Sequence, residues 1–137
     1  MAETIRKVSY YYATVPDKPG EGARMLQTLR SAGVNLLAFH AFPSARKSQA
    51  DFVPSDAASF ERAAKAAKLK LSKPKTAFLV EGDDRVGVLA GIMTRLGDAK
   101  VNVTAVSAVC AGMGRYGAIF WVKPKDFTKA ATAVGAM

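Results

Sequence analysis

The chain contains one pattern twice, and this internal repeat constrains its fold more than any other feature of the sequence. Shifting the 137 residues against themselves by about 67 positions pairs similar residues along both halves. Roughly a fifth of the aligned positions are identical. The paired residues include Asp17 with Asp84, Gly20 with Gly87, Asn35 with Asn102, and Phe60 with Phe127. Chance would not keep these residue types in one register, so we infer the duplication of one structural unit.

Each copy is predicted to begin with a strand, a helix and a second strand. The stretches "VSYYYATV" and "KTAFLVEG" are rich in β-branched and aromatic residues, which favour strands. Apolar residues then recur at helical spacing, as at Met25 and Leu29 in the first copy and at Ile92 and Leu96 in the second. The stretches "VNLLAFHAF" and "VNVTAVSAV" predict the second strands.

The rest of each copy predicts a hairpin and a second helix. Turn-like "PSARKS" and "AGMGRYG" lead into third strands at "QADFVP" and "GAIFWV". A second helix follows, with Phe60 and Phe127 on its apolar face. The first copy closes with a short predicted strand, "KLKLS", whereas the second stops at Met137 before its fourth strand. An open sheet edge of this kind would pair with another strand, in cis or from a partner chain.

These elements predict an α+β protein with two tandem units of strand–helix–strand–strand–helix–strand, spanning residues 5–72 and 73–137. Asp17 and Asp84 precede the first helices, where a carboxylate can cap free N–H groups. Gly33 fits the C-terminal end of the first helix.

Both faces of the predicted sheets are apolar. Val34, Leu36 and Ala38 can face the helices, but the alternate residues Leu37 and Phe39 are apolar as well. An antiparallel sheet with one solvated face should alternate apolar with polar residues. We therefore expect the second face to be covered, either by the other unit or by a second chain.

Composition excludes several classes of function. A single cysteine, Cys110, excludes an intramolecular disulfide and a cysteine metal site, and a single histidine, His40, excludes a multi-histidine metal site. We interpret Cys110 as a small hydrophobe and His40 as a packed or interface side chain. No paired carboxylates or nucleophiles suggest a reaction, so we expect a protein that is no enzyme and has no cofactor and no metal. No apolar h-region or 18-residue apolar run occurs, which predicts a cytoplasmic protein without a membrane partner.

The element order and the loop motifs resemble the ACT domain. Asp84-Arg85-Val86-Gly87-Val88-Leu89-Ala90 is similar to that family's D-R-P-G-V-L-A loop, and Asp17-Lys18-Pro19-Gly20 keeps its proline. The resemblance covers almost the whole chain as two tandem units, although Gly22 stands where the family has a leucine. It implies a ferredoxin-like sandwich with both helices on one face of each sheet.

The same resemblance implies an allosteric regulatory role. ACT units commonly bind amino acids or similar effectors between the first loop of one unit and the second strand of its neighbour. The implied partners are an amino-acid effector, a second copy of the chain in a homodimer, and a regulated enzyme. The implied ligand-binding residues are Asp17, Pro19, Gly20, Asn35, Asp84, Gly87, Val88 and Asn102.

RNA binding is the alternative. An RRM shares this element order, and "RYGAIFWV" is similar to its RNP1 pattern, while the net charge of +9 suits an anionic ligand. However, the glycine expected after Arg115 is absent, Ala118 replaces an aromatic residue, and the first copy lacks the pattern. We therefore favour the small-molecule hypothesis and do not expect nucleic acid as the partner.

Overall fold

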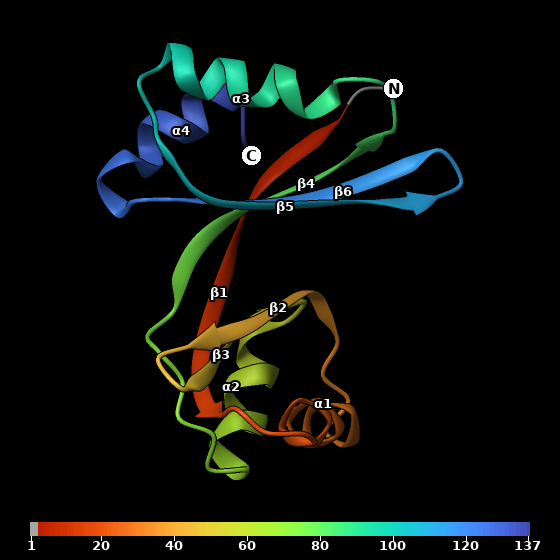
Figure 1. Ribbon diagram of the computed structural model, residues 1–137, viewed down its shortest axis with the longest axis vertical. Helices are drawn as coiled ribbons and strands as arrows, with labels where there is room; N and C mark the ends of the chain where they lie inside the picture. The colour runs from red at the N-terminus through yellow and green to blue at the C-terminus, as the bar shows by residue number, and fades with distance from the viewer. Residues whose placement is uncertain (1–2) are drawn as a thin grey trace. The chain divides into compact units, whose positions relative to one another are not determined.

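A computed structural model describes residues 3–137 and shows an α+β fold with six antiparallel strands and four α-helices in that range (Figure 1). The chain divides into two compact units. One comprises residues 9–75 and is called the repeat-1 unit. The other is called the repeat-2 unit and consists of two segments, the described residues up to Val8 and Thr76–Met137. The boundaries 5–72 and 73–137 for two ACT-like repeats stay a prediction.

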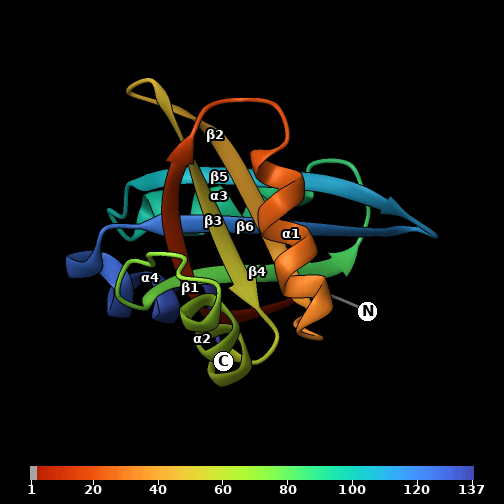
Figure 2. The ribbon, with the colours of Figure 1, turned by 90° about the horizontal axis from the view of Figure 1, so that it is seen from below.

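The repeat-1 unit has a three-stranded antiparallel sheet in the order β2–β3–β1. Its helices α1 and α2 lie on the same face of this sheet (Figure 2). The elements are β1 (Thr4–Pro16, from Ser9 onward in this unit), α1 (Glu21–Ser31), β2 (Leu36–Ser44), β3 (Lys47–Pro54) and α2 (Ala57–Ala66). Each predicted strand–helix–strand–strand–helix element of the first copy is thus confirmed.

The core of the repeat-1 unit lies between the sheet and the helices. Tyr11 and Phe52 project from neighbouring positions of β1 and β3, and Phe60 packs against both from α2, with ring centroids 5.0 and 5.3 Å away. Met25 and Leu29, the predicted apolar stripe of α1, are buried in the same cluster. Burying these side chains stabilises the unit by about 1.5–3 kcal/mol each relative to exposure.

The repeat-2 unit has the strand order β1–β4–β6–β5, with α3 and α4 together on one face (Figure 1). Its core joins Phe78, Phe120, Ile92 and Leu96, and the rings of Phe78 and Phe120 stack at 4.8 Å. The elements are β4 (Lys75–Asp83), α3 (Val88–Asp98), β5 (Val103–Gly112), β6 (Arg115–Val122), the 3₁₀ turn η1 (Pro124–Asp126) and α4 (Phe127–Val134).

The first residues of the chain take the place of the missing fourth strand of the second copy. The part of β1 before Ser9 belongs to the repeat-2 unit, where β1 neighbours β4. The C-terminal residue also pairs with this part of β1. Met137 N–H donates to Ile5 O at 3.0 Å, and Lys7 N–H donates to Met137 O at 3.1 Å. The edge of β4 that the sequence left open is therefore covered in cis.

The predicted strand "KLKLS" of the first copy is wrong. The stretch after α2 has no strand, and Ser72 makes its contact with β1, donating its N–H to Tyr12 O at 2.8 Å and accepting Tyr12 N–H at its hydroxyl. Leu69 and Leu71 instead pack against the core. Burial of these two apolar side chains determines the path of the segment, rather than a backbone ladder.

The prediction that Ala38 faces the helices is also wrong. A register shift between Leu36 and Ala38 marks a bulge in β2. Leu36 packs on the core, but after the bulge Phe39 lies opposite the core residue Phe52, with ring centroids 5.3 Å apart. The extra residue of a bulge reverses which side chains face the core. The equivalent strand β5 has the same irregularity between Val103 and Ala105.

Candidate functional site

Glycines in the left-handed conformation begin the first helix of each repeat. Gly20 (φ 93°) precedes α1 and Gly87 (φ 76°) precedes α3, and neither helix has a side-chain cap. The predicted capping by Asp17 and Asp84 is therefore wrong. Asp17 accepts the Ser48 hydroxyl at 3.0 Å, and Asp84 accepts the thiol of Cys110 at 3.3 Å. The left-handed turn supplies the change of chain direction, which favours glycine because it has no Cβ.

Two backbone amides at the start of α3 have no acceptor. Within residues 3–137, Val88 N–H donates to Arg85 O and Ala90 N–H to Gly87 O, but Gly87 N–H and Leu89 N–H donate to no group. Unpaired N–H groups and the helix dipole make this end of α3 electropositive. The first turn of α3 can therefore receive an anionic group.

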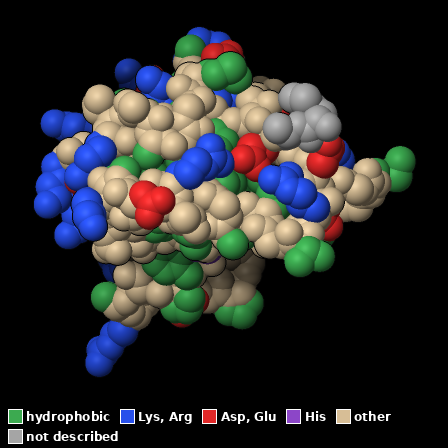
Figure 3. Space-filling model, turned by 90° about the horizontal axis from the view of Figure 1, so that it is seen from above, with side chains coloured by type: hydrophobic (Ala, Val, Ile, Leu, Met, Phe, Trp, Pro, Cys, Tyr) green, Lys and Arg blue, Asp and Glu red, His purple; other side chains and the backbone are tan. Residues whose placement is uncertain are grey.

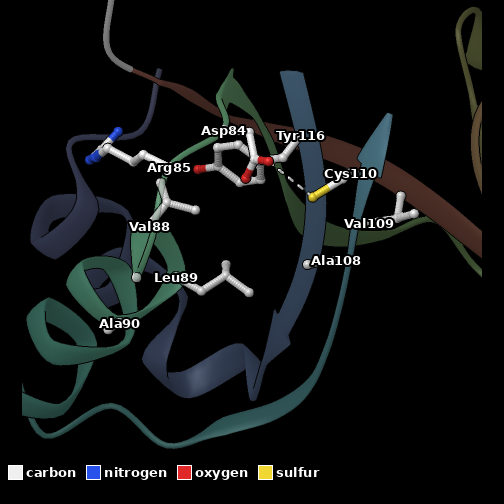
Figure 4. A pocket seen from close by; sticks show the side chains of 10 residues that line it. Asp84, Arg85, Val88, Leu89, Ala90, Ala108, Val109, Cys110 and Tyr116 are labelled. Carbon is white, nitrogen blue, oxygen red and sulfur yellow. Dashed lines mark hydrogen bonds between the residues drawn. The ribbon is translucent and has the colours of Figure 1, made fainter. Parts of the chain in front are cut away.

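A cavity of about 270 Å³ lies beside this turn (Figure 4). One wall is the loop and first turn of α3, the other is the far half of β5, and Tyr116 of β6 forms part of the lining. The lining residues are Asp84, Arg85, Gly87, Val88, Leu89, Ala90, Ala108, Val109, Cys110 and Tyr116. The chain order explains this meeting, because β5 begins after the end of α3 and runs back toward the loop that begins α3.

The charged groups of the cavity lie at its rim. The Asp84 carboxylate points toward Cys110, whereas the side chain of Arg85 points away from both (Figure 4). The hydrogen bond from the Cys110 thiol to Asp84 raises the pKa of that thiol, and the negative charge of the carboxylate raises it further. Tyr116 donates its hydroxyl to Glu3 at 3.1 Å, and burial together with this bond raises the pKa of Tyr116 to about 12. The thiol and the phenol are therefore neutral donors at pH 7.

Three of the four candidate residues of the second repeat meet in this cavity. Asp84, Gly87 and Val88 line it. Asn102 follows the other end of α3, a helix of 11 residues that spans about 16 Å at 1.5 Å per residue. Within the repeat-2 unit, Asn102 is thus separate from the loop residues.

The candidates of the first repeat are likewise divided between the two ends of α1. Asp17, Pro19 and Gly20 precede the helix. Asn35 follows it and lines a different cavity of about 470 Å³ beside the end of α1, together with Gly33 and Leu36. Gly33, with φ 73°, lies just past the helix end as predicted.

Sequence reasoning missed the contribution of β5 and β6 to the cavity. The interpretation of Cys110 as a small hydrophobe is wrong, because this residue is exposed and its thiol donates a hydrogen bond to Asp84. The signal was the topology, since the strand after the first helix must return to the loop that begins that helix. The bulge after Val103 then determines which alternate residues face the cavity.

The structure gives the RNA-binding alternative little support. Tyr116 and Phe120 of the RNP1-like stretch are buried in the core with α3 and α4, whereas stacking readers need aromatic residues on an open sheet face. Lys and Arg side chains gather along one edge of the face drawn in Figure 3.

Residues 3–137 contain no group of three or more His, Cys, Asp or Glu side chains that could hold a metal ion. None of the helices in that range is long and apolar enough to cross a membrane.

Comparison with solved structures identifies the fold. Protein BT0572 from Bacteroides thetaiotaomicron is similar with a TM-score of 0.81 at 14% identity, over 96% of this chain and 88% of that one. The regulatory subunit of aspartate kinase from Thermus thermophilus, in its ligand-free form, gives 0.66 at 15% identity, over 98% and 96%. The Thermus flavus subunit gives 0.62 at 17% identity, over 98% and 95%.

The fold is ferredoxin-like and of the ACT type. No protein-family model matches the sequence, and no curated protein does. The relationship to the aspartate kinase subunits therefore lies in the architecture, at identities where sequence alone shows no kinship.

Proposed function

We propose that this chain is a non-enzymatic regulatory protein that binds an amino acid, and that the bound ligand changes the association of its ACT-type units. The observation that supports the proposal is the cavity at the start of α3. It combines a carboxylate, unpaired amides and an apolar wall within one small volume of about 270 Å³. Ligand clefts for larger molecules usually measure about 300–1,000 Å³, so a small metabolite fits best.

The two polar groups of the cavity match the two charges of an amino acid. The Asp84 carboxylate can accept the ammonium group of a ligand, because its protein partner is a neutral thiol. The N–H groups of Gly87 and Leu89 can donate to the ligand carboxylate, as anions bind well at helix N-termini.

The open side of the cavity suggests how binding becomes regulation. Asp84, Ala108 and Val109 are all exposed, so a ligand held there stays partly in contact with solvent. A second ACT-type unit, from another copy of the chain or from an enzyme partner, would cover it. The ligand then shifts the equilibrium from separate to associated units, by as much as its affinity for the associated state exceeds its affinity for the separate one. Regulatory subunits of aspartate kinase share the fold, which favours an enzyme of amino-acid metabolism as the partner.

Binding of the twenty amino acids to dialysed protein, measured by calorimetry and thermal shift, tests the proposal. A ligand at 100 times its Kd should stabilise the protein by about 2.7 kcal/mol. Asp84→Asn should weaken binding, whereas the matched change Asp17→Asn tests whether the first repeat has a site of its own. Sedimentation with and without the ligand tests the change of association. If none of the twenty amino acids stabilises the protein, the proposal is wrong.

A further inference from the structure

We propose that the cavity beside α3 selects an amino acid with an uncharged aliphatic side chain, and that Leu89 and Ala108 are the residues that determine this choice. The inference rests on the proposed function, since it names the ligand class of the same site. It comes from the walls of the cavity rather than from its polar rim.

The walls that remain for a ligand side chain are apolar. Val88 and Leu89 face the cavity from the helix and Ala108 faces it from β5, whereas the Val109 side chain points to the opposite face of that strand (Figure 4). In Figure 4 the Leu89 side chain extends from α3 toward β5, on which Ala108 lies. Ala108 is opposite Ala118, a member of the core cluster under α3, so its methyl group lies on the helix side of the sheet. A ligand side chain between Leu89 and Ala108 would therefore contact methyl and methylene groups.

No charged partner is left for a charged ligand side chain. Asp84 and Arg85 are the charged residues of the lining, and both belong to the loop before α3. Asp84 is assigned to the ligand ammonium, and the side chain of Arg85, on the exposed loop, points away from Asp84 and Cys110 (Figure 4). Removing part of a charged side chain from water without a partner is unfavourable. Lysine, arginine, aspartate and glutamate should thus bind more weakly than leucine, isoleucine, valine or methionine.

The size of the cavity points in the same direction. The small side chain of Ala108 leaves room opposite Leu89, and a larger residue at this position would fill that room. Because Ala108 is exposed on an edge strand, Ala108→Leu can be accommodated without disturbing the core. The internal repeat offers a matched control, since Ala41 is the equivalent residue of β2 and is exposed as well.

Calorimetry with leucine, valine, lysine and aspartate tests the inference on the full chain. Leucine or valine should bind at least about tenfold more tightly than the two charged amino acids, as a pocket built for an aliphatic group discriminates by about this factor. Ala108→Leu should weaken leucine binding about tenfold or more, and Ala41→Leu should leave it unchanged. Saturating leucine should also slow the alkylation of Cys110, the single cysteine, which lines the cavity.

The possible results separate this inference from the proposed function. If lysine or aspartate binds most tightly and Asp84→Asn abolishes that binding, the proposed function stands and the inference is wrong. If leucine binds Ala108→Leu as well as the wild type, the inference is also wrong. If Ala108→Leu does not fold, Leu89→Ala replaces it and should weaken leucine binding with an unchanged circular dichroism spectrum. If no amino acid binds, both proposals fail.

Discussion

The thiol of Cys110 lies 3.3 Å from a carboxylate oxygen of Asp84, and this contact joins the far end of β5 to the loop that begins α3. The two residues are 26 positions apart in the sequence, so their meeting depends on the fold of the repeat-2 unit. The carboxylate raises the pKa of the thiol. The reactivity of the single cysteine therefore reports the state of the candidate site.

Asp84→Asn should make Cys110 more reactive. The change replaces the carboxylate whose hydrogen bond and negative charge hold the thiol pKa above its ordinary value, so the thiolate should form at lower pH. The rate of alkylation by iodoacetamide, measured from pH 7 to 10, should rise at each pH below the wild-type midpoint. Asp17→Asn, in the equivalent loop of the first repeat, should leave the profile unchanged. An unshifted midpoint in Asp84→Asn would contradict the contact.

Glu3 should contribute measurably to the stability of the repeat-2 unit. It accepts from Arg95 at 2.9 Å and from Tyr116 at 3.1 Å, which attaches the start of the chain to α3 and β6. Glu3→Gln should lower the free energy of unfolding by about 1 kcal/mol, since it weakens bonds to a charged acceptor. Glu21→Gln is the control, because Glu21 pairs with Arg24 within one exposed helix turn, where solvent screens the pair, and its loss should be clearly smaller than that of Glu3→Gln. Equal losses in urea unfolding would reject a special role for Glu3.

Stability should fall at high pH through Tyr116. Its pKa is about 12 in the folded protein, because of burial and the bond to Glu3, and about 10 in the unfolded chain. Since the folded value is the higher one, the contribution of the phenol is complete below about pH 10 and is lost as the pH rises through about 12. Urea unfolding at pH 8, 10 and 11 should show a smaller decline for Tyr116→Phe than for the wild type. Parallel declines would mean that Tyr116 does not titrate in this way.

The repeat made much of the fold predictable from the sequence. Periodicity identified the stripe of Met25 and Leu29 in α1, and the copy at offset 67 supported every element except the fourth strand with a second example. The loop motif also led to Asp84, Gly87 and Val88, which line one cavity. Local pattern sufficed for these features because helix and strand periods follow from backbone geometry.

Features that depend on distant partners could not be predicted in the same way. The bulge after Leu36 changes which residues face the core, although no residue type in β2 marks it. The pairing of Met137 with Ile5 and Lys7 joins the two ends of the chain, which no local signal indicates. The aspartates look like helix caps in sequence, but left-handed Gly20 and Gly87 occupy the cap positions and neither helix has a side-chain cap.

Phe60 and Phe127 occupy equivalent positions in the two sequence repeats, but they should contribute differently to stability. Phe60 is fully buried and contacts the rings of Tyr11 and Phe52, whereas its counterpart Phe127 is half-buried and stacks on Phe78 at 4.7 Å. Phe60→Ala should lower the free energy of unfolding by about 3–5 kcal/mol, because it leaves a cavity within a closed core. Phe127→Ala should cost less, since solvent already reaches that ring. Urea unfolding followed by circular dichroism measures both variants. If Phe127→Ala lowers the free energy of unfolding more than Phe60→Ala does, the extent of burial does not explain the difference between these two positions.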